Sequence, residues 1–546
     1  MKQKFKESIV LGNTKIERSI SVFKNFKEFN VISTQMNSVI FSDKQSHNFT
    51  IFLIEDIYDF NGAIPFVVVN NFKEKFPHFL QESITISNIT YNPICLFQRE
   101  KIVVSSLSLE DKIKFLLDCL SNLLFLKENE IEQEFQKEFL YYWNQSSSIR
   151  FIPQTFITCD EKAKFLDYYI KNSTIRVNSR DKKLNDSESW KKQRNLGIYI
   201  PIIDSEDILP PTKENKWSYI DILKILANPQ KDKISVDSYK QIKNLVIKRK
   251  TIDLYFSLPI NQTRILFGCK IVFKNAGAAK LIEKIISNVE KIEIFKLERN
   301  DYGYLHASIG NEVIDKKIGI VGIGSLGSYI ANELLQSGAK DLTLFDNDYL
   351  IPENTFRHYL GLNVINIKKS AALKFYFEEK HPEILINAIE DNISPENIQH
   401  YVNEYKLDYL VFCVGSTDIQ VDISKKVSKL NLDVAIIYVW LNENGTDSYT
   451  LVTFDNKNTC YICGRNYLES FSPAEKSTNV RWLNDGCGGT RIKYGTRTLL
   501  SATNGFLYAF EKSLTYKNPF GVSASTLKGI EEVAITSPEG CDYCGT

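Results

Sequence analysis

The pattern of hydrophobic and polar positions changes along the chain and divides it into three parts. In the first part, short apolar runs at 51–54 and 64–69 predict strands. Two later stretches, 109–124 and 128–143, carry apolar residues at three- and four-residue spacing, which predicts helices. Strands followed by helices are typical of an α+β unit, and we expect residues 1–150 to form one.

The middle part, residues 151–310, has a less regular pattern. A polar tract at 178–193, rich in Lys, Asn, Asp and Ser, predicts a loop, and the apolar run at 197–203 after it predicts a strand. Towards the end of this part we expect a helix over 277–289, followed by a strand over 291–298. This mixture predicts an α/β linker domain, and we assign no chemistry to its residues.

From about residue 311 onward, apolar runs that predict strands alternate with stretches of helical periodicity. The expected strands are 318–321, 342–345, 384–389, 409–414 and 434–439. The expected helices between them include 369–380 and 418–430. Such alternation predicts a largely parallel, doubly wound sheet across residues 311–546.

Size and charge exclude several classes of protein. At 546 residues, the chain is too long for a single hydrophobic core. Its formal net charge of +1, without a block of Lys and Arg interleaved with aromatic residues, argues against a nucleic-acid partner. We find neither a signal peptide nor a run of about 18 uncharged apolar residues, so we expect a cytoplasmic protein without a membrane partner. In a reducing compartment, its 10 cysteines favour metal-binding or catalytic roles over disulfides.

A glycine-rich segment, Val321–Gly327, joins a predicted strand to a predicted helix. Gly322, Gly324 and Gly327 in this turn are candidates for a phosphate site, because backbone N–H groups at a helix N-terminus attract phosphate. Asp346 ends the next predicted strand, where an acid that binds a ribose is expected. By itself, this segment fits a nicotinamide or flavin enzyme as well as an enzyme that uses ATP.

Charged residues near and after Asp346 favour ATP. Asp348 and Asn354 are followed by Arg357, and Lys369 begins the next predicted helix. An enzyme that directs attack at the α-phosphate of ATP needs fixed cations, because charge develops on the phosphate oxygens. Arg357 and Lys369 can supply these cations, whereas a dehydrogenase has no such need. The two acids then serve the ribose and a magnesium ion.

Together these residues resemble the ThiF-type, ubiquitin-activating superfamily of adenylyltransferases. The family pattern combines the glycine loop, the acidic pair, an Asn-x-x-Arg and a Lys heading a helix that ends at Asn-Pro, which is His381-Pro382 here. The resemblance covers about residues 311–546 and implies ATP and magnesium as cofactors, and a homodimer. It also implies a magnesium-binding acid after the fourth strand, for which Asp418 is the candidate, although the usual Asp-x-x-Asp spacing is absent.

Two Cys-x-x-Cys pairs occur in the last part of the chain. Four thiolates in two such pairs are typical of a closed, tetrahedral structural zinc site, provided that the fold brings the pairs together. The alternatives are a redox pair or two unrelated pairs. The predicted zinc ligands are Cys460, Cys463, Cys541 and Cys544.

Cys487 lies between these pairs and is flanked by glycines, which favours an accessible turn. An accessible cysteine acts as a nucleophile when its thiolate is stabilised. In the enzymes that this part resembles, a mobile cysteine between the zinc pairs takes the acyl group from the adenylate. That resemblance implies this role for Cys487, and a loop cysteine without a function is the alternative.

Cys95 lies between apolar residues, a setting that alone is typical of a buried core thiol. Its surroundings, with segments 64–69, 76–79 and 134–143, resemble the prokaryotic ubiquitin-conjugating-like domains that are fused to ThiF-type enzymes. The resemblance covers about residues 1–150 and implies that Cys95 carries a thioester.

Eukaryotic conjugating enzymes carry His-Pro-Asn shortly before the cysteine, which polarises the thioester carbonyl. Here only Asn92-Pro93 is near, in the opposite order. The oxyanion donor is therefore open between His78 and Asn92.

The order of conjugating-like domain, linker domain and activating domain resembles the fusion enzymes of bacterial antiphage systems, such as the ubiquitin-transferase-like component of CBASS. That resemblance implies activation of a partner's C-terminal carboxylate as an acyl-adenylate, a thioester relay from Cys487 to Cys95 and ligation to a target amine. Arg357 is the third catalytic candidate. The donor would be a cGAS-like nucleotidyltransferase or a ubiquitin-like protein.

Two other functions stay open at this point. An activator of a sulfur-carrier protein shares the ATP site and the zinc but needs no conjugating domain. A nucleotide-gated, non-catalytic scaffold would bind ATP with inert cysteines, and the intact Arg357 and Lys369 argue against it.

Overall fold

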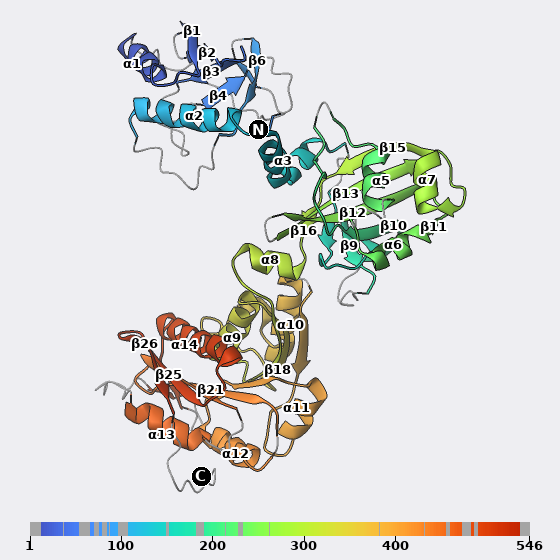
Figure 1. The fold of residues 1–546 in the computed structure, drawn as a ribbon. Coiled ribbons are helices and arrows are strands. Elements are labelled where there is room, and N and C mark those ends of the chain that lie inside the picture. The colour runs from blue at the N-terminus through green and yellow to red at the C-terminus, as the bar shows by residue number, and fades with distance from the viewer. Residues whose placement is uncertain are drawn as a thin grey trace. The chain divides into compact units, whose positions relative to one another are not determined.

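The structure is a computed structural model, and it divides into two compact units, Met1–Arg299 and Asn300–Thr546 (Figure 1). It describes residues 13–35, 38–53, 66–69, 76–78, 84–86, 88–96, 107–148, 152–181, 190–212, 215–227, 233–260, 263–381, 383–430, 432–454, 459–471, 482–484 and 490–535. Within these ranges no helix has both the length and the hydropathy needed to cross a membrane.

The N-terminal part is an antiparallel sheet covered by helices. Its six strands run in the order β1-β2-β3-β4-β6-β5. They are β1 Asn30–Gln35, β2 Ser38–Ser42, β3 Asn48–Phe52, β4 Phe66–Val69, β5 Ile84–Ile86 and β6 Ile89–Pro93. Helices α1 (Asn13–Phe23) and α2 (Leu109–Leu124) pack apolar side chains against it. The predicted helix at 109–124 is confirmed, as are the described parts of the two predicted strands.

The helix predicted over 128–143 is two helices, α3 (Glu128–Lys137) and α4 (Phe139–Gln145). The chain breaks at Glu138, whose φ of −95° and ψ of 16° lie outside the helical range. Packing explains the break, because α4 stacks its Phe139 and Trp143 with ring centroids 5.7 Å apart and buries both in the core of the next sheet.

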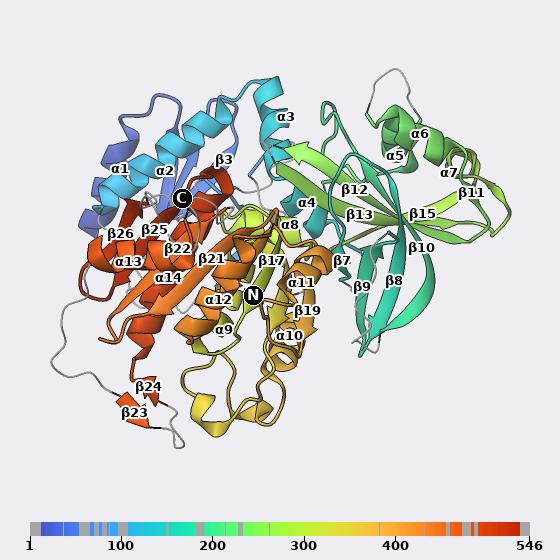
Figure 2. The same ribbon diagram turned by 90° about the horizontal axis from the view of Figure 1, so that it is seen from below.

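The middle part is built on a mixed sheet in the order β15-β13-β12-β10-β8-β9-β7-β16. These strands are β7 Gln154–Phe156, β8 Lys164–Lys171, β9 Thr174–Ser179, β10 Lys191–Pro201, β12 Thr251–Ile260, β13 Thr263–Phe273, β15 Val289–Phe295 and β16 Glu298–Arg299. Helices α5 (Tyr219–Leu226), α6 (Val236–Lys243) and α7 (Leu281–Asn288) gather on one side of it (Figure 2). Ile198 and Ile200 join the core beneath these helices, whereas Tyr199 between them joins the core of the opposite face, as the strand period of two requires.

Two sequence predictions for this part are wrong at their edges. The loop predicted over 178–193 is shorter, because β9 reaches Ser179 and β10 begins at Lys191. Its polar residues are compatible with strand ends, since Asp167 of β8 forms ion pairs with Lys192 at 2.6 Å and with Arg180 at 3.2 Å. The helix predicted over 277–289 begins only at Leu281, because residues 279–280 form strand β14, which pairs with β11 (Val246–Ile247).

The C-terminal unit is a doubly wound sheet in the order β19-β18-β17-β20-β21-β22-β25-β26. Five strands are parallel: β17 Ile314–Val321, β18 Ala339–Phe345, β19 Leu385–Ile389, β20 Tyr409–Phe412 and β21 Ala435–Leu441. The antiparallel strands β22 (Asp447–Thr453), β25 (Phe520–Ser525) and β26 (Gly529–Ala534) extend it. The predicted parallel sheet is confirmed, and the antiparallel extension is an addition to it.

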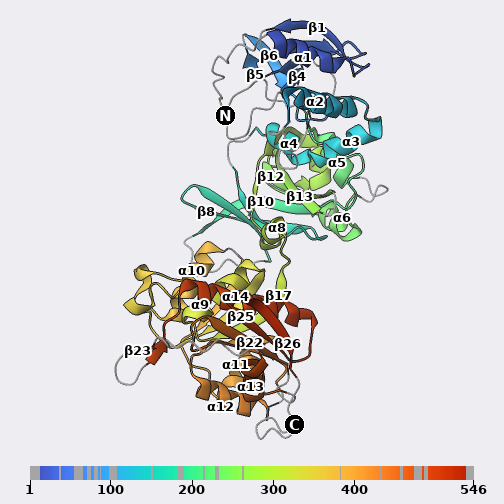
Figure 3. The same cartoon turned by 90° about the vertical axis from the view of Figure 1, so that its left-hand side faces the viewer.

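Helices cover both faces of this sheet (Figures 1 and 3). Helices α9 (Ser325–Gln336), α10 (Lys369–Lys380) and α14 (Thr496–Thr515) bury apolar residues on one face. Helices α11 (Ile398–Tyr405), α12 (Thr417–Val427) and α13 (Tyr461–Phe471) do so on the other.

The strand order reverses at β17, which pairs with β18 on one side and β20 on the other. Val321 at the end of β17 lies opposite Phe345 and Phe412, so the carboxyl ends of the three strands meet at one edge. In doubly wound sheets this topological switch point is where ligands bind.

Candidate functional site

The glycine-rich segment connects β17 to α9 at the switch point, as expected. Gly322 has a φ of +85°, a conformation that other residues rarely adopt. A Cβ on Gly327 would lie 2.0 Å from the carbonyl oxygen of Gly322, so glycine is needed for the helix to approach the strand. Gly324 is the N-cap of α9, and a Cβ there would meet no described atom within 4 Å. The space beside Gly324 at the N-terminus of α9 is therefore open among the described residues, and a helix N-terminus attracts phosphate.

Asp346 fixes the shape of this loop. Its Oδ2 accepts a hydrogen bond from the backbone N–H of Ile323 at 2.7 Å, and its Oδ1 accepts one from Asp348 at 2.8 Å. Burial raises the pKa of Asp346, and the charge of Lys369 and these backbone N–H groups oppose that rise. The predicted ribose acid thus lies beside the loop and already supports its backbone.

Lys369 joins the two acids of the predicted nucleotide site. Its side chain is 8% exposed, and its Nζ lies 2.8 Å from Oδ2 of Asp348 and 3.9 Å from Oδ1 of Asp346. The backbone N–H of Lys369 also donates to the carbonyl of Asp348. The start of α10 therefore holds a buried ammonium group at the edge of the sheet where the glycine loop lies.

Asn354 and Arg357 lie in the crossover between β18 and α10. The Oδ1 of Asn354 accepts a hydrogen bond from the N–H of Ile351 at 3.1 Å, which closes the short helix η3 (Pro352–Asn354). The carbonyl of Asn354 accepts from the N–H of Arg357 at 2.9 Å. Among the described atoms, the buried Nε of Arg357 has no hydrogen-bond partner. An unpartnered guanidinium nitrogen is a donor available to an anionic ligand.

Sequence reasoning missed two residues of this site, His358 and Ser325. The Nδ1 of His358 accepts the N–H of Leu360 at 3.0 Å, so its Nε2 carries the proton and donates to the carbonyl of Ile323 at 3.0 Å. Burial lowers the pKa of His358 to about 4, which keeps the ring neutral. The ring therefore ties the crossover to the glycine loop. Its place directly after Arg357 was visible in the sequence, but its burial was not.

Ser325 is the first residue of α9 and is 8% exposed. Its hydroxyl is buried and makes no hydrogen bond within the described part of the chain. A buried hydroxyl at a helix N-terminus without a partner is a second donor that a phosphate could satisfy. The only signal in the sequence was a serine between two of the loop glycines.

Asp418, the predicted magnesium ligand, lies in the first turn of α12, which follows β20. It is exposed, and Ser416 caps the helix by accepting the N–H of Ile419. Because β20 lies beside β17, the helix begins at the same edge of the sheet as the glycine loop.

Cys460 and Cys463 lie at the start of α13, and both are buried. Their sulfur atoms are 3.5 Å apart. Two thiolates on one tetrahedral zinc, each at about 2.3 Å, lie roughly 3.8 Å from each other, so this geometry fits one half of a zinc site. Cys541, Cys544 and the predicted nucleophile Cys487 lie outside the described residues. Within the described part, no group of three or more metal-ligating side chains occurs.

Cys95 follows β6 and is exposed, which excludes the buried core position that its apolar neighbours alone suggest. Its N–H donates to the carbonyl of His78 at 2.8 Å. The ring of His78 faces two carboxylates, with Nε2 3.2 Å from Glu134 and Nδ1 3.0 Å from Glu138. Of the two candidate oxyanion donors, His78 thus lies against Cys95, whereas Asn92 lies in β6 opposite Val69.

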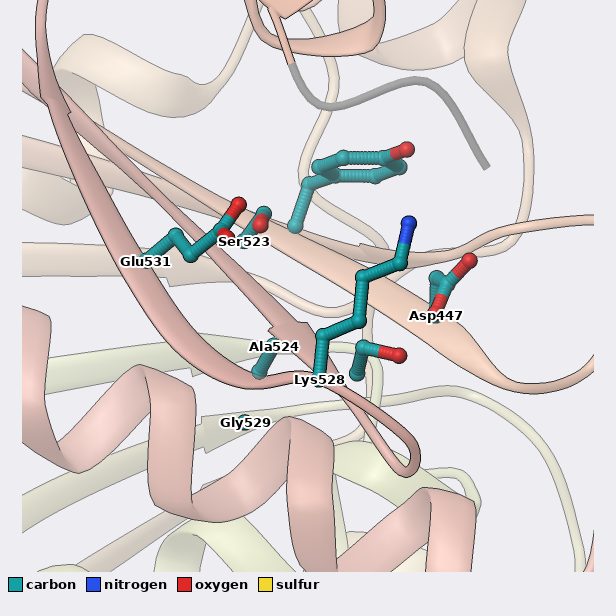
Figure 4. A pocket seen from close by; sticks show the side chains of 8 residues that line it. Asp447, Ser523, Ala524, Lys528, Gly529 and Glu531 are labelled. Carbon is teal, nitrogen blue, oxygen red and sulfur yellow. The ribbon is translucent and has the colours of Figure 1, made fainter. Parts of the chain in front are cut away.

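The C-terminal unit also carries a hollow at its antiparallel strands (Figure 4). Its lining comes from β22, β25, β26 and the turn between β25 and β26, and includes Asp447, Lys528 and Glu531. These strands form the antiparallel edge of the sheet, and none of the predicted site residues lines the hollow.

Comparisons with known proteins agree with this geometry. Residues 310–489 match the ThiF family. The chain is 27% identical over 198 residues to the ATP-dependent ubiquitin transferase-like protein Cap2 of Vibrio cholerae, covering 35% of this chain and 33% of that protein. It is 24% identical over 195 residues to ubiquitin-like modifier-activating enzyme 5 of Caenorhabditis elegans, covering 32% and 45%.

A solved structure of Escherichia coli MccB with ATP covers 42% of this chain and 68% of that chain, with 17% identity and a TM-score of 0.32. The aligned segments span less than half of the length of the two curated relatives. The chain thus resembles ubiquitin-activating-like proteins in its ThiF family domain.

Proposed function

We propose that this chain uses ATP to adenylate the C-terminal carboxylate of a partner protein and then ligates the acyl group to a target amine. Residues 311–546 would perform the activation, residues 1–150 the conjugation, and residues 151–310 would link them. One observation carries the proposal: the glycine loop, Asp346 and Lys369 lie at one edge of the sheet. The crossover that leads from β18 to Lys369 also carries Arg357, whose Nε lacks a partner among the described atoms.

Each of these residues has a role in the proposed first step. The phosphates of ATP bind at the start of α9, where the space beside Gly324 is open among the described residues. Arg357 and Lys369 stabilise the charge that develops while the partner's carboxylate oxygen attacks the α-phosphorus and pyrophosphate leaves. Asp348 and Asp418 would hold magnesium, which neutralises phosphate charge when it is bound.

A thioester relay would follow. The thiolate of Cys487 attacks the acyl carbon of the adenylate and releases AMP, and the thiolate of Cys95 then displaces Cys487 in turn. The second exchange is nearly isoenergetic because one thioester replaces another. A target amine finally attacks the acyl carbon, loses a proton to solvent and releases the Cys95 thiolate. The exposure of Cys95 supports its part in this relay, since a buried thiol could not meet a partner.

The donor divides the proposal into two versions. Our first choice is the C-terminus of a cGAS-like nucleotidyltransferase in an antiphage system, which follows from the resemblance of the domain order to antiphage fusion enzymes. The alternative is a ubiquitin-like modifier, which the likeness to ubiquitin-like modifier-activating enzyme 5 supports, or a sulfur-carrier protein. A homodimer in the cytoplasm, where free thiols persist, completes both versions.

The first test measures ATP–pyrophosphate exchange with each candidate donor, followed by non-reducing gels. We expect exchange only with a donor that has a free C-terminal carboxylate, and a reductant-sensitive adduct on the chain. The adduct should stop at Cys487 in the Cys95→Ala variant and should be absent from the Cys487→Ala variant. Exchange that proceeds equally with a donor whose C-terminus is amidated would contradict the proposal.

We also propose that Cys460 and Cys463 bind a structural zinc together with Cys541 and Cys544. The sulfur separation of 3.5 Å supports this assignment. Elemental analysis of the purified chain should find about one zinc per chain, and Cys460→Ser should remove it while the matched variant Cys119→Ser retains it. A wild-type chain without zinc, after purification with added zinc and no chelator, would exclude the site.

A further inference from the structure

Cys95 lies in a cluster of charged side chains that the proposed relay does not use. His78 contacts the Cys95 side chain, and the glutamates of α3 and the α3–α4 junction surround its ring. We propose that His78 is a catalytic residue of the conjugating site, held as a cation by Glu134 and Glu138, and that it keeps Cys95 in the reactive thiolate form. This inference rests on the proposed function of Cys95, and it adds the group that activates the thiol.

The backbone places His78 independently of its ring. Its carbonyl accepts the N–H of Cys95 at 2.8 Å, and its own N–H donates to the hydroxyl of Tyr142 at 2.9 Å. Its φ of +68° lies in the left-handed region, which costs free energy for a residue other than glycine, asparagine or aspartate. The fold therefore presents the imidazole to Cys95 at a strained position that tertiary contacts maintain.

The two carboxylates stabilise the cationic form of the ring. Glu134 lies within hydrogen-bond distance of Nε2, and Glu138 places a second negative charge 3.0 Å from Nδ1, so the ring faces a carboxylate at each nitrogen. Burial opposes the charge of His78, but contact with Cys95 and with the two glutamates raises its pKa to about 10. Among the described residues, Lys137 is a further charged group at this place, and it forms an ion pair with Glu134 at 2.5 Å. At neutral pH His78 therefore cannot act as a general base and acts as a fixed charge.

The proton on Nδ1 of His78 is the one that can interact with the sulfur of Cys95. Nδ1 lies 3.0 Å from Glu138, yet it is not aligned for a hydrogen bond with any described atom. An N–H with an electrostatic partner but no aligned acceptor can turn towards the Cys95 sulfur. A nearby cation stabilises a thiolate, as in other reactive cysteine sites.

The stabilised thiolate serves both steps at Cys95. The thiol first gives its proton to solvent, and the thiolate attacks the acyl carbon of the incoming thioester. A carbon–sulfur bond forms to Cys95, and the donor thiolate leaves and takes a proton from solvent. When an amine later takes the acyl group, Cys95 leaves as a thiolate, and the same cation stabilises it. No oxidant, reductant or other reactant is required.

Alkylation by iodoacetamide tests the idea without ATP, donor or target, so its outcome is separate from that of the proposed relay. The rate at Cys95 is followed by mass spectrometry of its peptide in the full chain, with Cys119 as the internal reference. His78→Asn removes the charge and keeps a residue that tolerates a positive φ. We expect alkylation of Cys95 at pH about 7 to slow by about tenfold or more in this variant, with Cys119 unchanged.

Substitutions in α3 and at the α3–α4 junction provide a second test of the proposal. Glu138→Gln should move the titration of the His78 ring, followed by NMR, to lower pH, and the rate at Cys95 should fall with it. Glu132→Gln makes the same charge change at an exposed position of α3 and should behave as the wild type. Equal rates at Cys95 in wild type and His78→Asn would overturn the proposal, as would a His78 ring that titrates near its ordinary pKa in the wild type.

Discussion

At the scale of single residues, the conformation of the glycine loop depends on the lack of a side chain at particular positions. Gly322 needs its positive φ, and Gly327 needs to lack a side chain because the backbone of Gly322 occupies that space. Gly324 is different, since a methyl group there would meet no described atom within 4 Å. The three glycines therefore belong to one motif, but the physical reason for having glycine differs between the three positions.

This difference predicts different outcomes for two alanine substitutions. Gly327→Ala should destabilise the unit by about 2 kcal/mol or more, because a methyl group cannot fit 2.0 Å from a carbonyl oxygen. Gly324→Ala should cost less, about 1 kcal/mol, because its methyl group meets no described atom within 4 Å and only its ψ of −149° disfavours alanine. Hydrogen exchange of α9 amides would measure both, and equal protection in the two variants would refute the argument.

His358 predicts a pH dependence of stability. Its folded pKa of about 4 lies below the ordinary value of 6.5, so between these values the unfolded chain binds a proton that the folded chain does not. Stability is full above about pH 6.5 and falls as the pH drops towards 4, by on the order of 3 kcal/mol. Urea unfolding across this window should show a shallower decline in His358→Gln. Parallel declines would show that the ring does not carry the effect; His381, whose pKa burial also lowers to about 4, remains in both proteins.

At the scale of elements, the first turn of helix α9 holds both a serine that joins the helix to the crossover and a serine that we propose binds the ligand. The hydroxyl of Ser328 donates to the carbonyl of Ser325 at 2.9 Å and accepts the N–H of Tyr359 at 3.1 Å. The hydroxyl of Ser325, three residues earlier, is buried without a partner in the part of the chain that the structure describes. One serine thus joins the helix to the crossover, and the other is free to bind a ligand.

These serines form a matched pair for substitution. Ser325→Ala should leave stability within about 0.5 kcal/mol and weaken ATP binding by about tenfold, the value of a hydrogen bond to a charged group. Ser328→Ala should cost about 1–3 kcal/mol, because it leaves a buried N–H unsatisfied, with ATP affinity near that of the wild type. Calorimetric titration and chemical unfolding separate the two effects. A Ser325→Ala variant that binds ATP as tightly as the wild type would exclude the contact.

The ends of helices and strands agree with the sequence prediction only where local apolar spacing determines them. Helix 109–124 has the predicted ends because its apolar spacing continues to both ends, and helix 369–380 also has the predicted ends. The break at Glu138 has no such signal, since the apolar spacing continues across it while α4 turns into another core. The strand ends at Ser179 and Lys191 are polar and are held by ion pairs that join distant segments.

At the scale of the whole molecule, the two chemistries lie in different units. The nucleotide loop, Lys369 and Arg357 belong to Asn300–Thr546, whereas Cys95 and His78 belong to Met1–Arg299. Each site is built from contacts inside its own unit. Adenylation should therefore not need Cys95.

A substitution at Cys95 tests this independence. Cys95→Ala should keep donor-dependent pyrophosphate exchange within about twofold of the wild type and lose the final conjugate, because exchange precedes the thiol steps. Cys119→Ala should keep both activities and serves as the matched control. Loss of exchange in Cys95→Ala would mean that the two units depend on each other for the first step.

The sequence by itself determined the doubly wound sheet, the glycine loop and the set of Asp346, Asp348 and Lys369, because local periodicity and spacing along one βαβ unit encode them. Only the tertiary structure decided that Cys95 is exposed, that His78 lies against it between two glutamates, and that His358 and Ser325 belong to the nucleotide site. Those facts depend on segments up to about 60 residues apart in the chain, as between His78 and Glu138. Burial and long-range contact leave no local pattern, so they arise only when the chain folds.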